Sequence, residues 1–557
     1  MPTINFDKKE LFELLGKELS DDEMIEIVNS MGVALEEITD EEIVIEVFPN
    51  RPDLLSLRGF VRALRFFLGL SKPSLDLEKK LKEPEKDFKV IIDKSVSKVR
   101  PYTACAIVKN LKLDDKKIKE IIQIQEKLHI TFGRNRKKVA IGIYPLEKIK
   151  LPIRYLAKKP KEIKFVPLGE TKEMNGLEIL EYHPKGKEYA NLLEGKEVFP
   201  IFVDSNNNIL SMPPIINSEL TGKVTEKTKD VFIECSGFSF KDVKEGVNII
   251  ASALLDMGAQ VHKMELVYPD KTELTPDFTF LEMPVDKAYI EKYLGVKLKD
   301  SDIKTCLNKT GLIYDEKKSI VKIPPYRVDI IHPIDIVEDI AIGYGYNNFP
   351  AELSQVFSVA EESKEAILSR KLRESLIAHG LIEVKNYCLS NPNDETEGIL
   401  KSWELVRLKN SWSIDFSVLR RSLIPSVLNT FKRNKHYEYP QNIFEIGSVF
   451  VPAKDEILEQ EKLCVALADV EADYTKIRQI LDALARDFDF EIEYLEHNND
   501  MFIEGRSAKV FLKDSKESLA TIGELHPKVL ENFSLQTPVA LFELDLDKLL
   551  EYLLKKN

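Results

Sequence analysis

The stretch from Pro324 to Pro350 places the strongest constraint on the fold, because it combines a defined helix start with a dense set of acids. It reads PPYRVDIIHPIDIVEDIAIGYGYNNFP. A proline is well tolerated at the first position of a helix, where a backbone N–H has no partner to lose, so we expect a helix that begins at Pro333. Apolar residues then recur at helical spacing and form one face, which comprises Ile336, Val337, Ile340, Ala341 and Tyr344.

Four carboxylates accompany this helix in the pattern D-x5-D-x2-E-D. At about 100° per residue, the last three fall on a face roughly opposite to the apolar one. Hard oxygen donors of this kind suit Mg²⁺ far better than a soft or borderline metal. An acidic face opposite an apolar face is equally typical of a solvated surface helix, so spacing alone leaves both interpretations open. The candidate ligands are Asp329, Asp335, Glu338 and Asp339.

The length of the chain, 557 residues, exceeds what one hydrophobic core supports, and it predicts about three or four domains. Hydrophobic residues make up 43% of the chain and charged residues 31%, which is typical of a soluble globular protein. No stretch approaches the roughly 18 to 20 apolar residues of a membrane span. The first residues lack the zones of a signal peptide, so we expect a cytoplasmic protein with no membrane partner.

The cysteines and the net charge exclude further classes. The five cysteines are scattered, odd in number and never spaced C-x-x-C, which argues against zinc sites and a disulfide framework. A formal net charge of −13 argues against extensive coating of nucleic acid. Contact with RNA would therefore be restricted to a local surface or shared with a partner.

Residues 1–80 have the pattern of a small α/β unit. Capping-box patterns at Asp7 and Ser20 precede two helical runs, and VALEEITDEEIVIEVFP alternates in the manner of two strands. The segment NRPDLLSLRGF follows from Asn50, where one local interpretation makes Asp53 a helix N-cap and leaves Arg58 solvated. A charged linker, LEKKLKEPEKD, then leads to residues 88–270, whose mixture of β-branched strands and helices predicts an α+β domain.

Two further domains follow in the sequence. Residues 271–350 predict two short helices, a hairpin through LIYDEKKSIVKI and the acidic helix, an order that indicates a winged-helix-like unit. Its charge is mixed, so no DNA partner is expected. Residues 358–557 predict a larger α/β domain, with an amphipathic helix that ends at Gly380 and a strand through IEVKNYCL.

Several motifs, in one order along nearly the whole chain, resemble the β subunit of phenylalanyl-tRNA synthetases of the archaeal and eukaryotic cytosolic type. They are NRPDLLSLRG, the segment from Pro200 to Gly237, the acidic helix, and in the last domain VRLKNSWSIDFSVLRRSLIPSVLNTFKRN, NIFEIGSVF, FIEGRSAKVFL and IGELHPKVLENF. The resemblance implies an α+β multidomain fold. Its parts are an N-terminal α/β unit (1–80), an editing domain of the tRNA-binding B3/B4 type (88–270), a winged-helix-like B5-type domain with a magnesium site (271–350) and a catalytically inactive, antiparallel class II synthetase core (358–557).

The resemblance also implies a function. The family joins L-phenylalanine to tRNA(Phe), converting ATP to AMP and pyrophosphate, as an α2β2 heterotetramer in which the α subunit binds ATP and phenylalanine and charges the tRNA. This chain would supply assembly, tRNA docking and hydrolytic editing of Tyr-tRNA(Phe), and its four acids would hold Mg²⁺ at the boundary with the α subunit. A free-standing aminoacyl-tRNA deacylase or RNA-binding protein without an α partner is the alternative.

Five residues fall on the editing pattern of the family: Ser211, Pro213, Pro214, Asn217 and Glu234. The resemblance makes Ser211, Asn217 and Glu234 the candidate editing residues. In VFIEC, alternation places Glu234 beside Phe232 on one strand face. A buried carboxylate acceptor would favour tyrosine, whose para-hydroxyl phenylalanine lacks. The other interpretation is a partly solvated strand face on which Glu234 has no special role.

The chain departs from many relatives at the strand that follows the basic turn RNRKK. Where they carry Thr-His-Asp, this chain has Ile143, Tyr144 and Pro145, so no role of that His or Asp transfers. No hydrolytic triad is visible, and His129 and His183 are typical of surface or satisfied core histidines. Hydrolysis would then depend on water positioned by backbone groups, polar side chains or the tRNA.

The last domain lacks the phosphate clamp of active class II enzymes. It contains neither the Arg-x-Glu pair nor the Gly-x-Gly-x-x-Arg element, and without such an arginine phosphoryl charge has no bidentate partner. We therefore interpret three arginines of this domain as packing or interface residues: Arg420, Arg421 and Arg506.

Overall fold

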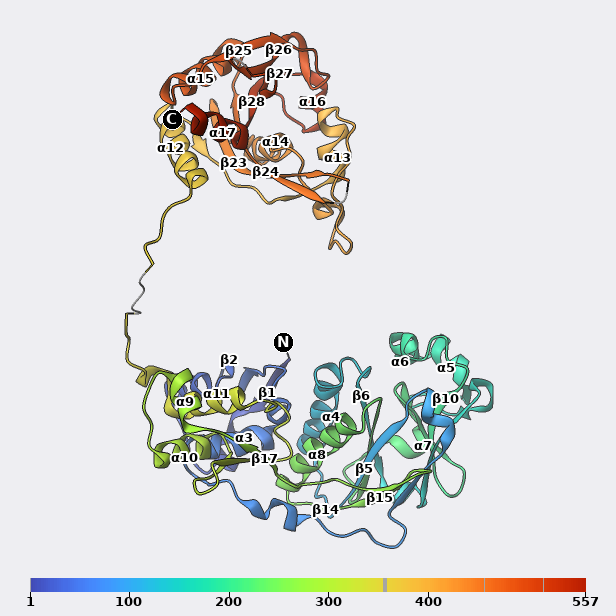
Figure 1. Ribbon diagram of the computed structural model, residues 1–557. Coiled ribbons are helices and arrows are strands. Elements are labelled where there is room, and N and C mark those ends of the chain that lie inside the picture. The colour runs from blue at the N-terminus through green and yellow to red at the C-terminus, as the bar shows by residue number, and fades with distance from the viewer. Residues whose placement is uncertain (1, 354–357, 455, 514, 557) are drawn as a thin grey trace. The chain divides into compact units, whose positions relative to one another are not determined.

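The computed structural model describes residues 2–353, 358–454, 456–513 and 515–556 (Figure 1). The chain divides into two compact units, unit 1 (Met1–Glu352) and unit 2 (Leu353–Asn557). The first three domains expected from the sequence thus all lie within unit 1, and the last one makes up unit 2.

Unit 1 begins with a small antiparallel sheet in the order β1-β3-β2, covered by helices. The expected caps form: Asp7 accepts a hydrogen bond from the backbone of Glu10, and Ser20 and Glu23 form a complete capping box. Phe6 of the sheet stacks on Phe60 of the third helix. The elements are β1 (Thr3–Asp7), α1 (Lys8–Leu15), α2 (Asp21–Ser30), β2 (Ala34–Ile38), β3 (Glu42–Glu46) and α3 (Leu57–Phe67).

Two sheets form the next part of unit 1. The first has the order β12-β11-β10-β7-β4-β15-β16, with β4 parallel to β7 and β15 and the other pairs antiparallel. The second is antiparallel with the order β14-β5-β13-β6. The strands are β4 (Lys89–Ile92), β5 (Tyr102–Lys109), β6 (Val139–Pro145), β7 (Ile153–Lys158), β10 (Phe199–Val203), β11 (Ile209–Met212), β12 (Ile216–Asn217), β13 (Val231–Gly237), β14 (Gln260–His262), β15 (Met264–Val267) and β16 (Thr272–Thr275), with a separate pair β8 (Lys164–Phe165) and β9 (Met174–Asn175).

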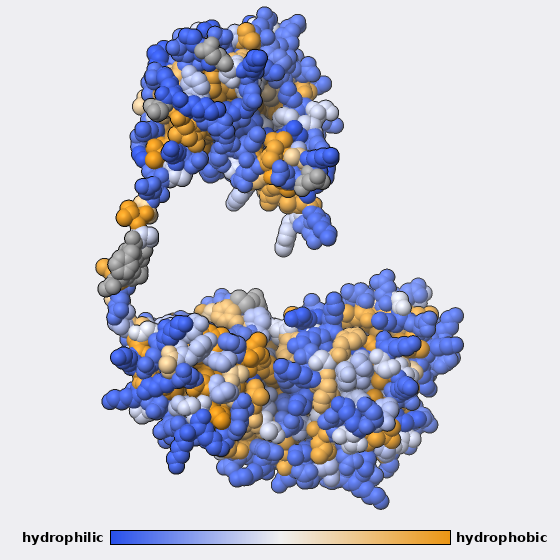
Figure 2. Space-filling view, viewed as in Figure 1, coloured by the Kyte–Doolittle hydropathy of each residue, from blue (hydrophilic) through white to orange (hydrophobic). Residues whose placement is uncertain are grey.

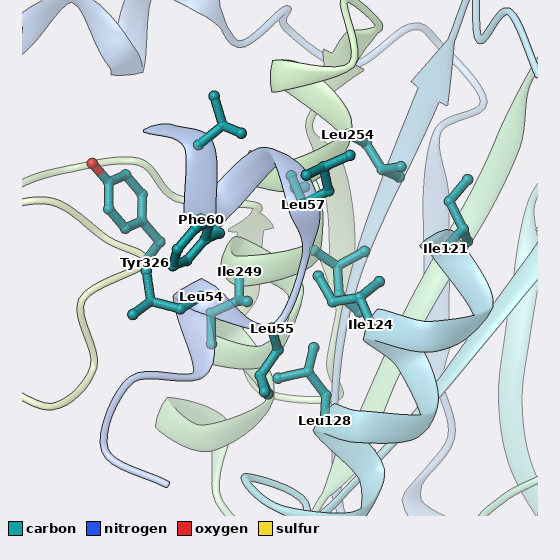
Figure 3. Close-up of a cluster of buried hydrophobic side chains, with 14 of the residues drawn as sticks. Leu54, Leu55, Leu57, Phe60, Ile121, Ile124, Leu128, Ile249, Leu254 and Tyr326 are labelled. Carbon is teal, nitrogen blue, oxygen red and sulfur yellow. The ribbon is translucent and has the colours of Figure 1, made fainter. Parts of the chain in front are cut away.

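Helices cover one face of the β14-β5-β13-β6 sheet, and the other face packs on the first sheet. Ile233 of β13 lies in the core formed with α3, α4 and α8, part of which Figure 3 shows. Phe232 lies in the core between the two sheets, with Phe202 of β10. This alternation confirms the two faces expected for VFIEC. The helices are α4 (Asp115–Ile130), α5 (Gly176–Tyr182), α6 (Pro184–Tyr189), α7 (Glu219–Gly222) and α8 (Phe240–Asp256).

Unit 1 ends with helices and a small antiparallel sheet in the order β17-β19-β18. The two short helices and the hairpin form where the sequence predicts them, and the acidic helix begins at Pro333 as expected. The elements are β17 (Leu281–Pro284), α9 (Lys287–Leu294), α10 (Asp300–Lys309), β18 (Ile313–Asp315), β19 (Ile320–Ile323) and α11 (Pro333–Tyr344).

Unit 2 is built on a sheet in the order β20-β23-β24-β28-β27-β26-β25, which is antiparallel apart from the β20–β23 pair. Apolar cores lie on both faces of this sheet, because Phe444 and Ile443 of β23 belong to different clusters. The elements are α12 (Lys364–Ala378), β20 (Ile382–Glu383), β21 (Leu389–Ser390), α13 (Pro392–Glu395), β22 (Val418–Leu419), α14 (Ile424–Asn434), β23 (Gln441–Pro452), β24 (Ile457–Ala468), α15 (Tyr474–Asp487), β25 (Ile492–Glu496), β26 (Phe502–Leu512), β27 (Ser518–Leu525), α16 (Pro527–Asn532), β28 (Val539–Asp545) and α17 (Leu546–Lys556).

The strand expected through IEVKNYCL is wrong in its extent. Only β20 and β21 are strand. The backbone N–H of Val384 still donates to the Phe444 carbonyl of β23 at 2.8 Å, and the strand pairing stops after it. The reason is a side-chain interaction, since the backbone N–H and Nδ2 of Asn386 donate to the Glu445 carboxylate at 3.1 and 2.8 Å. The Glu445 carboxylate thus accepts the backbone hydrogen bond that a carbonyl of a neighbouring strand would accept in a regular sheet.

Polar side chains dominate the viewed face of each unit, and apolar side chains form smaller patches between them (Figure 2). Among the described helices, none has both the length and the apolar character needed to cross a bilayer. All five cysteines are free thiols, which confirms that no disulfide framework supports the fold.

Candidate functional site

A pocket of about 420 Å³ opens in unit 1 between α4, β6, β13 and the β11–β12 hairpin. Its wall is mostly aliphatic, from the isoleucines of α4 and β6 and from the loop around Pro213 and Pro214. The structure brings all three editing candidates into this wall, from β11, β12 and β13. They are Ser211, Asn217 and Glu234.

Glu234 is a buried residue of the pocket lining. Its side chain is only 2% exposed, so the alternative of a partly solvated strand face is wrong. Burial raises the pKa of Glu234 to about 8, although a hydrogen bond from Tyr144 opposes the shift. Among the described residues that line the pocket, four atoms are buried without a hydrogen-bond partner: Glu234 Oε2, Ser211 Oγ, His129 Nδ1 and Arg136 Nε. Buried polar groups are normally paired, and Glu234 Oε2 and Ser211 Oγ are the acceptors among these atoms that a ligand could satisfy.

A second polar group lies in the same pocket around Arg136. Arg136 donates to the carbonyl of Ile215 at 2.8 Å and to Glu126 at 3.3 Å, and its guanidinium lies 4.3 Å from the centre of the Tyr189 ring. A hydrogen bond to His129 and the charge of Arg136 lower the pKa of Glu126 to about 2. The pocket therefore holds an ionised Glu126 and a neutral, buried Glu234.

Both histidines that line the pocket have structural partners. His129 Nε2 accepts from the backbone N–H of Ile141 at 2.9 Å, so the ring proton lies on Nδ1, which faces Glu126 at 3.4 Å. Burial lowers the pKa of His129. His183 Nδ1 accepts from the backbone of Lys185 at 3.1 Å and caps α6. In each ring the nitrogen that carries the lone pair thus already accepts a backbone N–H, and His129 Nδ1 is buried without a hydrogen-bond partner among the described residues.

The acidic helix α11 does not gather its four carboxylates around one point. Arg327 forms a fork on Asp329, with Nε–Oδ1 and Nη2–Oδ2 distances of 2.9 and 2.8 Å, and Nη2 also donates to Asp339 at 2.8 Å. Burial raises the pKa of Asp339 to about 6, against the opposing charge of Arg327. Asp339 is 3% exposed, so placing it on a solvated helix face is wrong.

The other two acids lie nearer the surface of α11. Asp335 Oδ2 accepts from the backbone N–H groups of Ile331 and His332, each at 2.8 Å, and completes a capping box. Glu338 is exposed, and both acids line a shallow pocket with Tyr293. Among the described residues, no three His, Cys, Asp or Glu side chains are arranged to hold a metal ion. The four-carboxylate magnesium site does not fit this chain by itself, because Arg327 neutralises two of the donors.

The NRPD segment has a role that local sequence reasoning missed. Arg51 forms the same kind of fork on Asp53, with two distances of 2.9 Å, and the charges of Arg327 and Asp329 act on Arg51. Asp53 is therefore not the N-cap of α3; Ser56 is. The shared R-x-D spacing of the two segments was the sequence signal that could have linked them.

Arg58 is also misassigned by the local interpretation. Its side chain is 11% exposed and lies 3.2 Å from Glu10 and 3.6 Å from Glu120. Burial raises the pKa of Glu120. Arg58 therefore ties α3 to α1 and α4 inside unit 1, where the sequence alone allowed a solvated side chain.

The arginines of unit 2 have protein partners. Arg420 donates from Nη1 to Glu445 at 2.6 Å and from Nε to the Ser448 carbonyl at 2.8 Å, and Arg420 and Glu445 are almost completely buried. Arg421 donates to the Glu404 carbonyl, and Arg506 to Glu524. The buried contacts of Arg420 confirm a packing role for it and leave it unable to clamp a phosphate. For Arg421 and Arg506, whose side chain is 58% exposed, a packing or interface role stays a prediction.

Family models match successive parts of the chain. They are described as the Phe-tRNA synthetase β subunit B1 domain (residues 1–70), the B3/4 domain (90–251), the tRNA synthetase B5 domain (283–346) and the phenylalanyl-tRNA synthetase β chain CLM domain (350–546). Phenylalanine–tRNA ligase β subunits from Methanosphaera stadtmanae and Pyrococcus furiosus are each 38% identical to the chain, over 98% and 99% of it and 99% and 100% of their own lengths. The chain belongs to the phenylalanyl-tRNA synthetase β-subunit family.

A solved structure supports the fold of unit 1 in this β-subunit family. It is an N-terminal fragment of the phenylalanyl-tRNA synthetase β subunit from Pyrococcus horikoshii, with 38% identity and a TM-score of 0.59 over 62% of this chain and 99% of the fragment. The resemblance drawn from the motifs is therefore confirmed at the level of the family. In this β-subunit chain the pocket lies in the B3/4 match and helix α11 in the B5 match.

Proposed function

We propose that the chain is the β subunit of an α2β2 ligase that joins L-phenylalanine to tRNA(Phe), with conversion of ATP to AMP and pyrophosphate. Its full-length similarity to curated β subunits carries this proposal. Charging takes place on the α subunit, which binds ATP and phenylalanine, and the complex acts in translation in the cytoplasm. The buried Arg420–Glu445 pair supports charging elsewhere, since it removes a candidate phosphate ligand from unit 2.

The pocket of unit 1 is the proposed site of editing. It takes the tyrosyl group of Tyr-tRNA(Phe), and Glu234, Ser211 and Asn217 line it. A phenol hydroxyl would satisfy Glu234 Oε2, whereas a phenylalanyl ring would leave that oxygen unpaired. The aliphatic wall excludes bulk water from the ring. Because both pocket histidines have structural partners, the hydrolytic water is positioned by backbone groups, polar side chains or the tRNA.

The domain types implied by the family form part of the proposal. Residues 1–80 form the N-terminal unit, 88–270 the editing domain, 271–350 a winged-helix-like domain and 358–557 a class II core that does no aminoacylation. The antiparallel sheet of unit 2 supports the last of these, and the α10 helix with the β18–β19 hairpin supports the third.

Unit 2 supplies a surface for an α subunit. Large hydrophobic side chains are exposed on it. Tyr387 is 79% exposed, Ile414 is 71% exposed and Trp412 is fully exposed. The rings of Tyr387 and Phe416 lie 6.3 Å apart, so part of this surface is continuous. Exposed apolar patches of this kind mark interaction sites, and an obligate partner commonly covers more than about 2,000 Å².

The proposed magnesium site takes fewer ligands from this chain than the sequence predicts. Asp335 and Glu338 are the carboxylates of α11 that Arg327 does not neutralise, so they could hold Mg²⁺ only together with ligands from the α subunit. Such an ion would draw the two subunits together by charge. No step of the reaction depends on it in this chain.

Co-expression with an α subunit tests the proposal. The expected result is a heterotetramer by light scattering that charges tRNA(Phe) with phenylalanine and deacylates Tyr-tRNA(Phe). The chain alone should not form aminoacyl-tRNA. Robust aminoacylation by the isolated chain, or deacylation by a stable monomer that ignores the α subunit, would instead favour a free-standing enzyme.

A further inference from the structure

We propose that Tyr144 is the residue that positions Glu234, and that it thereby sets the preference of the pocket for a ligand with a phenol hydroxyl. This inference rests on the proposed editing function. It concerns a residue that does not itself line the pocket but lies directly behind one that does.

The register of β6 and β13 brings the two side chains together. Glu234 is opposite Gly142, and Phe232 is opposite Tyr144, so all of them share the sheet face that meets the other sheet. Tyr144 is completely buried and its ring stacks on Phe232 at 5.7 Å. Its hydroxyl lies 3.1 Å from Glu234 Oε1 and 3.3 Å from Asn217 Oδ1. A phenol has a single proton, so it donates to one of these oxygens at a time.

Gly142 makes this contact possible. A Cβ at position 142 would overlap with the Tyr144 hydroxyl and with Glu234 Oε1. Both neighbours are held in packed strands, so neither could move aside without cost. The glycine leaves the space through which a tyrosine two residues along the same strand reaches the carboxyl group of β13.

The contact gives the two Glu234 oxygens different surroundings. Oε1 accepts from Tyr144, while Oε2 remains buried without a partner among the described residues. A carboxyl group held at one oxygen cannot rotate freely about its last bond, so the other oxygen keeps a fixed direction. Because Glu234 lines the pocket, that oxygen is available to an occupant, and it is an acceptor once the carboxyl group is ionised. A hydroxylated ring satisfies it, and an unsubstituted ring does not.

Tyr144→Phe tests the inference in the full-length chain, because it removes one hydroxyl and keeps the ring. The measured quantity is the ratio of kcat/KM for deacylation of Tyr-tRNA(Phe) to that of Phe-tRNA(Phe). We expect this ratio to fall roughly 10-fold or more, since an acceptor that is no longer held loses most of its discrimination. A pH profile of the deacylation rate should shift to higher pH, because Glu234 loses a hydrogen bond that stabilises its ionised form.

Tyr155→Phe is the matched control. Tyr155 is equally buried in the same core, but its hydroxyl donates to the Arg100 carbonyl at 2.7 Å. Its loss should lower stability by a similar amount and leave the selectivity ratio and the pH profile unchanged. An unchanged ratio in Tyr144→Phe would overturn the inference. An increased ratio would also overturn it, because it would mean that Tyr144 competes with the ligand for Glu234.

Binding of L-tyrosinamide and L-phenylalaninamide, measured by calorimetry, separates this inference from the editing proposal. A wild-type chain that prefers tyrosinamide without deacylating Tyr-tRNA(Phe) would contradict editing while leaving the role of Tyr144 standing. Loss of that preference in Tyr144→Phe would then support the inference. Equal binding of both amides by the wild-type chain would overturn it.

Discussion

Arg327 Nη2 donates to Asp339 Oδ2 at 2.8 Å, and both side chains are almost completely buried. The same nitrogen donates to Asp329, so one guanidinium holds two carboxylates inside unit 1. Burying charges is costly unless they are paired, so this cluster depends on Arg327, with a further contribution from the charge of Arg51. Arg327 thus supplies positive charge to two acids that the sequence alone assigned to a metal ion.

Removal of Arg327 should destabilise unit 1 strongly. Arg327→Ala leaves Asp329 and Asp339 buried without their partner, at an expected cost of about 3–5 kcal/mol. Urea unfolding followed by circular dichroism measures it. Both tryptophans lie in unit 2, so the tryptophan fluorescence transition should stay in place and acts as an internal reference. Arg370→Ala, which removes an exposed pair with Glu362, should cost less than about 1 kcal/mol. A cost that small for Arg327 would contradict the buried pairing.

Glu338 should act on assembly and leave the fold of this chain unchanged. Glu338→Gln removes an exposed charge from α11, so the free energy of unfolding should stay within about 0.5 kcal/mol of the wild-type value. The proposed shared magnesium site would nevertheless lose a ligand. The heterotetramer should therefore begin to dissociate at a higher protein concentration than the wild-type complex does. Analytical ultracentrifugation with and without EDTA checks this. Assembly that responds neither to the substitution nor to the chelator would remove magnesium from the interface.

Trp412 should contribute to the same assembly through apolar contact. Trp412→Ala removes a fully exposed ring, so the isolated chain should keep its stability. In the complex, buried tryptophans commonly contribute about 2 kcal/mol or more, so affinity for the α subunit should fall roughly 30-fold or more. Exposed Val470 on the same unit provides the control substitution. Equal effects of the two substitutions would mean that the surface around Trp412 is not the interface.

The stability of unit 1 should fall with rising pH because of Glu234. Below its ordinary value of 4.5 both the folded and the unfolded chain carry the proton, and between 4.5 and about 8 only the folded chain keeps it. Deprotonation of the unfolded chain therefore lowers the free energy of unfolding across this range, by up to about 5 kcal/mol, and the loss levels off above pH 8. Glu234→Gln cannot titrate. Urea unfolding at pH 5 and pH 8 measures the free energy of unfolding of both proteins. The value for the variant minus the value for the wild type should become more positive at pH 8, and a constant difference would contradict the raised pKa.

Arg420 and Arg506 form ion pairs that should differ greatly in strength. Arg420→Ala leaves Glu445 buried without its cation and should destabilise unit 2 by about 3–5 kcal/mol. The Arg506 side chain is 58% exposed, so Arg506→Ala should cost less than about 1 kcal/mol despite a similar distance to Glu524. Tryptophan fluorescence during urea unfolding reports unit 2 directly. Similar costs for the two variants would show that burial does not control these pairs.

Local signals in the sequence were enough for the elements of the site. The start of α11 at Pro333 and the alternation of β13 are both confirmed, because helix starts and periodicity depend on neighbours within a few residues. The motifs also identified the family and grouped Glu234 and Ser211 as editing candidates, and the structure places both in the lining of one pocket.

Tertiary structure alone decided which charges meet. Arg58 pairs with Glu120, which lies 62 residues away, and Tyr144 reaches Glu234 across 90 residues. Asp339 lies inside the fold, where it accepts a hydrogen bond from Arg327. Helical spacing within α11 does not predict this contact. The sequence by itself determined where several helices and strands form, among them α11 and β13, and which family the chain joins, since these follow from local geometry and ordered motifs. The partner of each buried charge was settled by packing between distant segments, because only burial makes an unpaired charge too costly to keep.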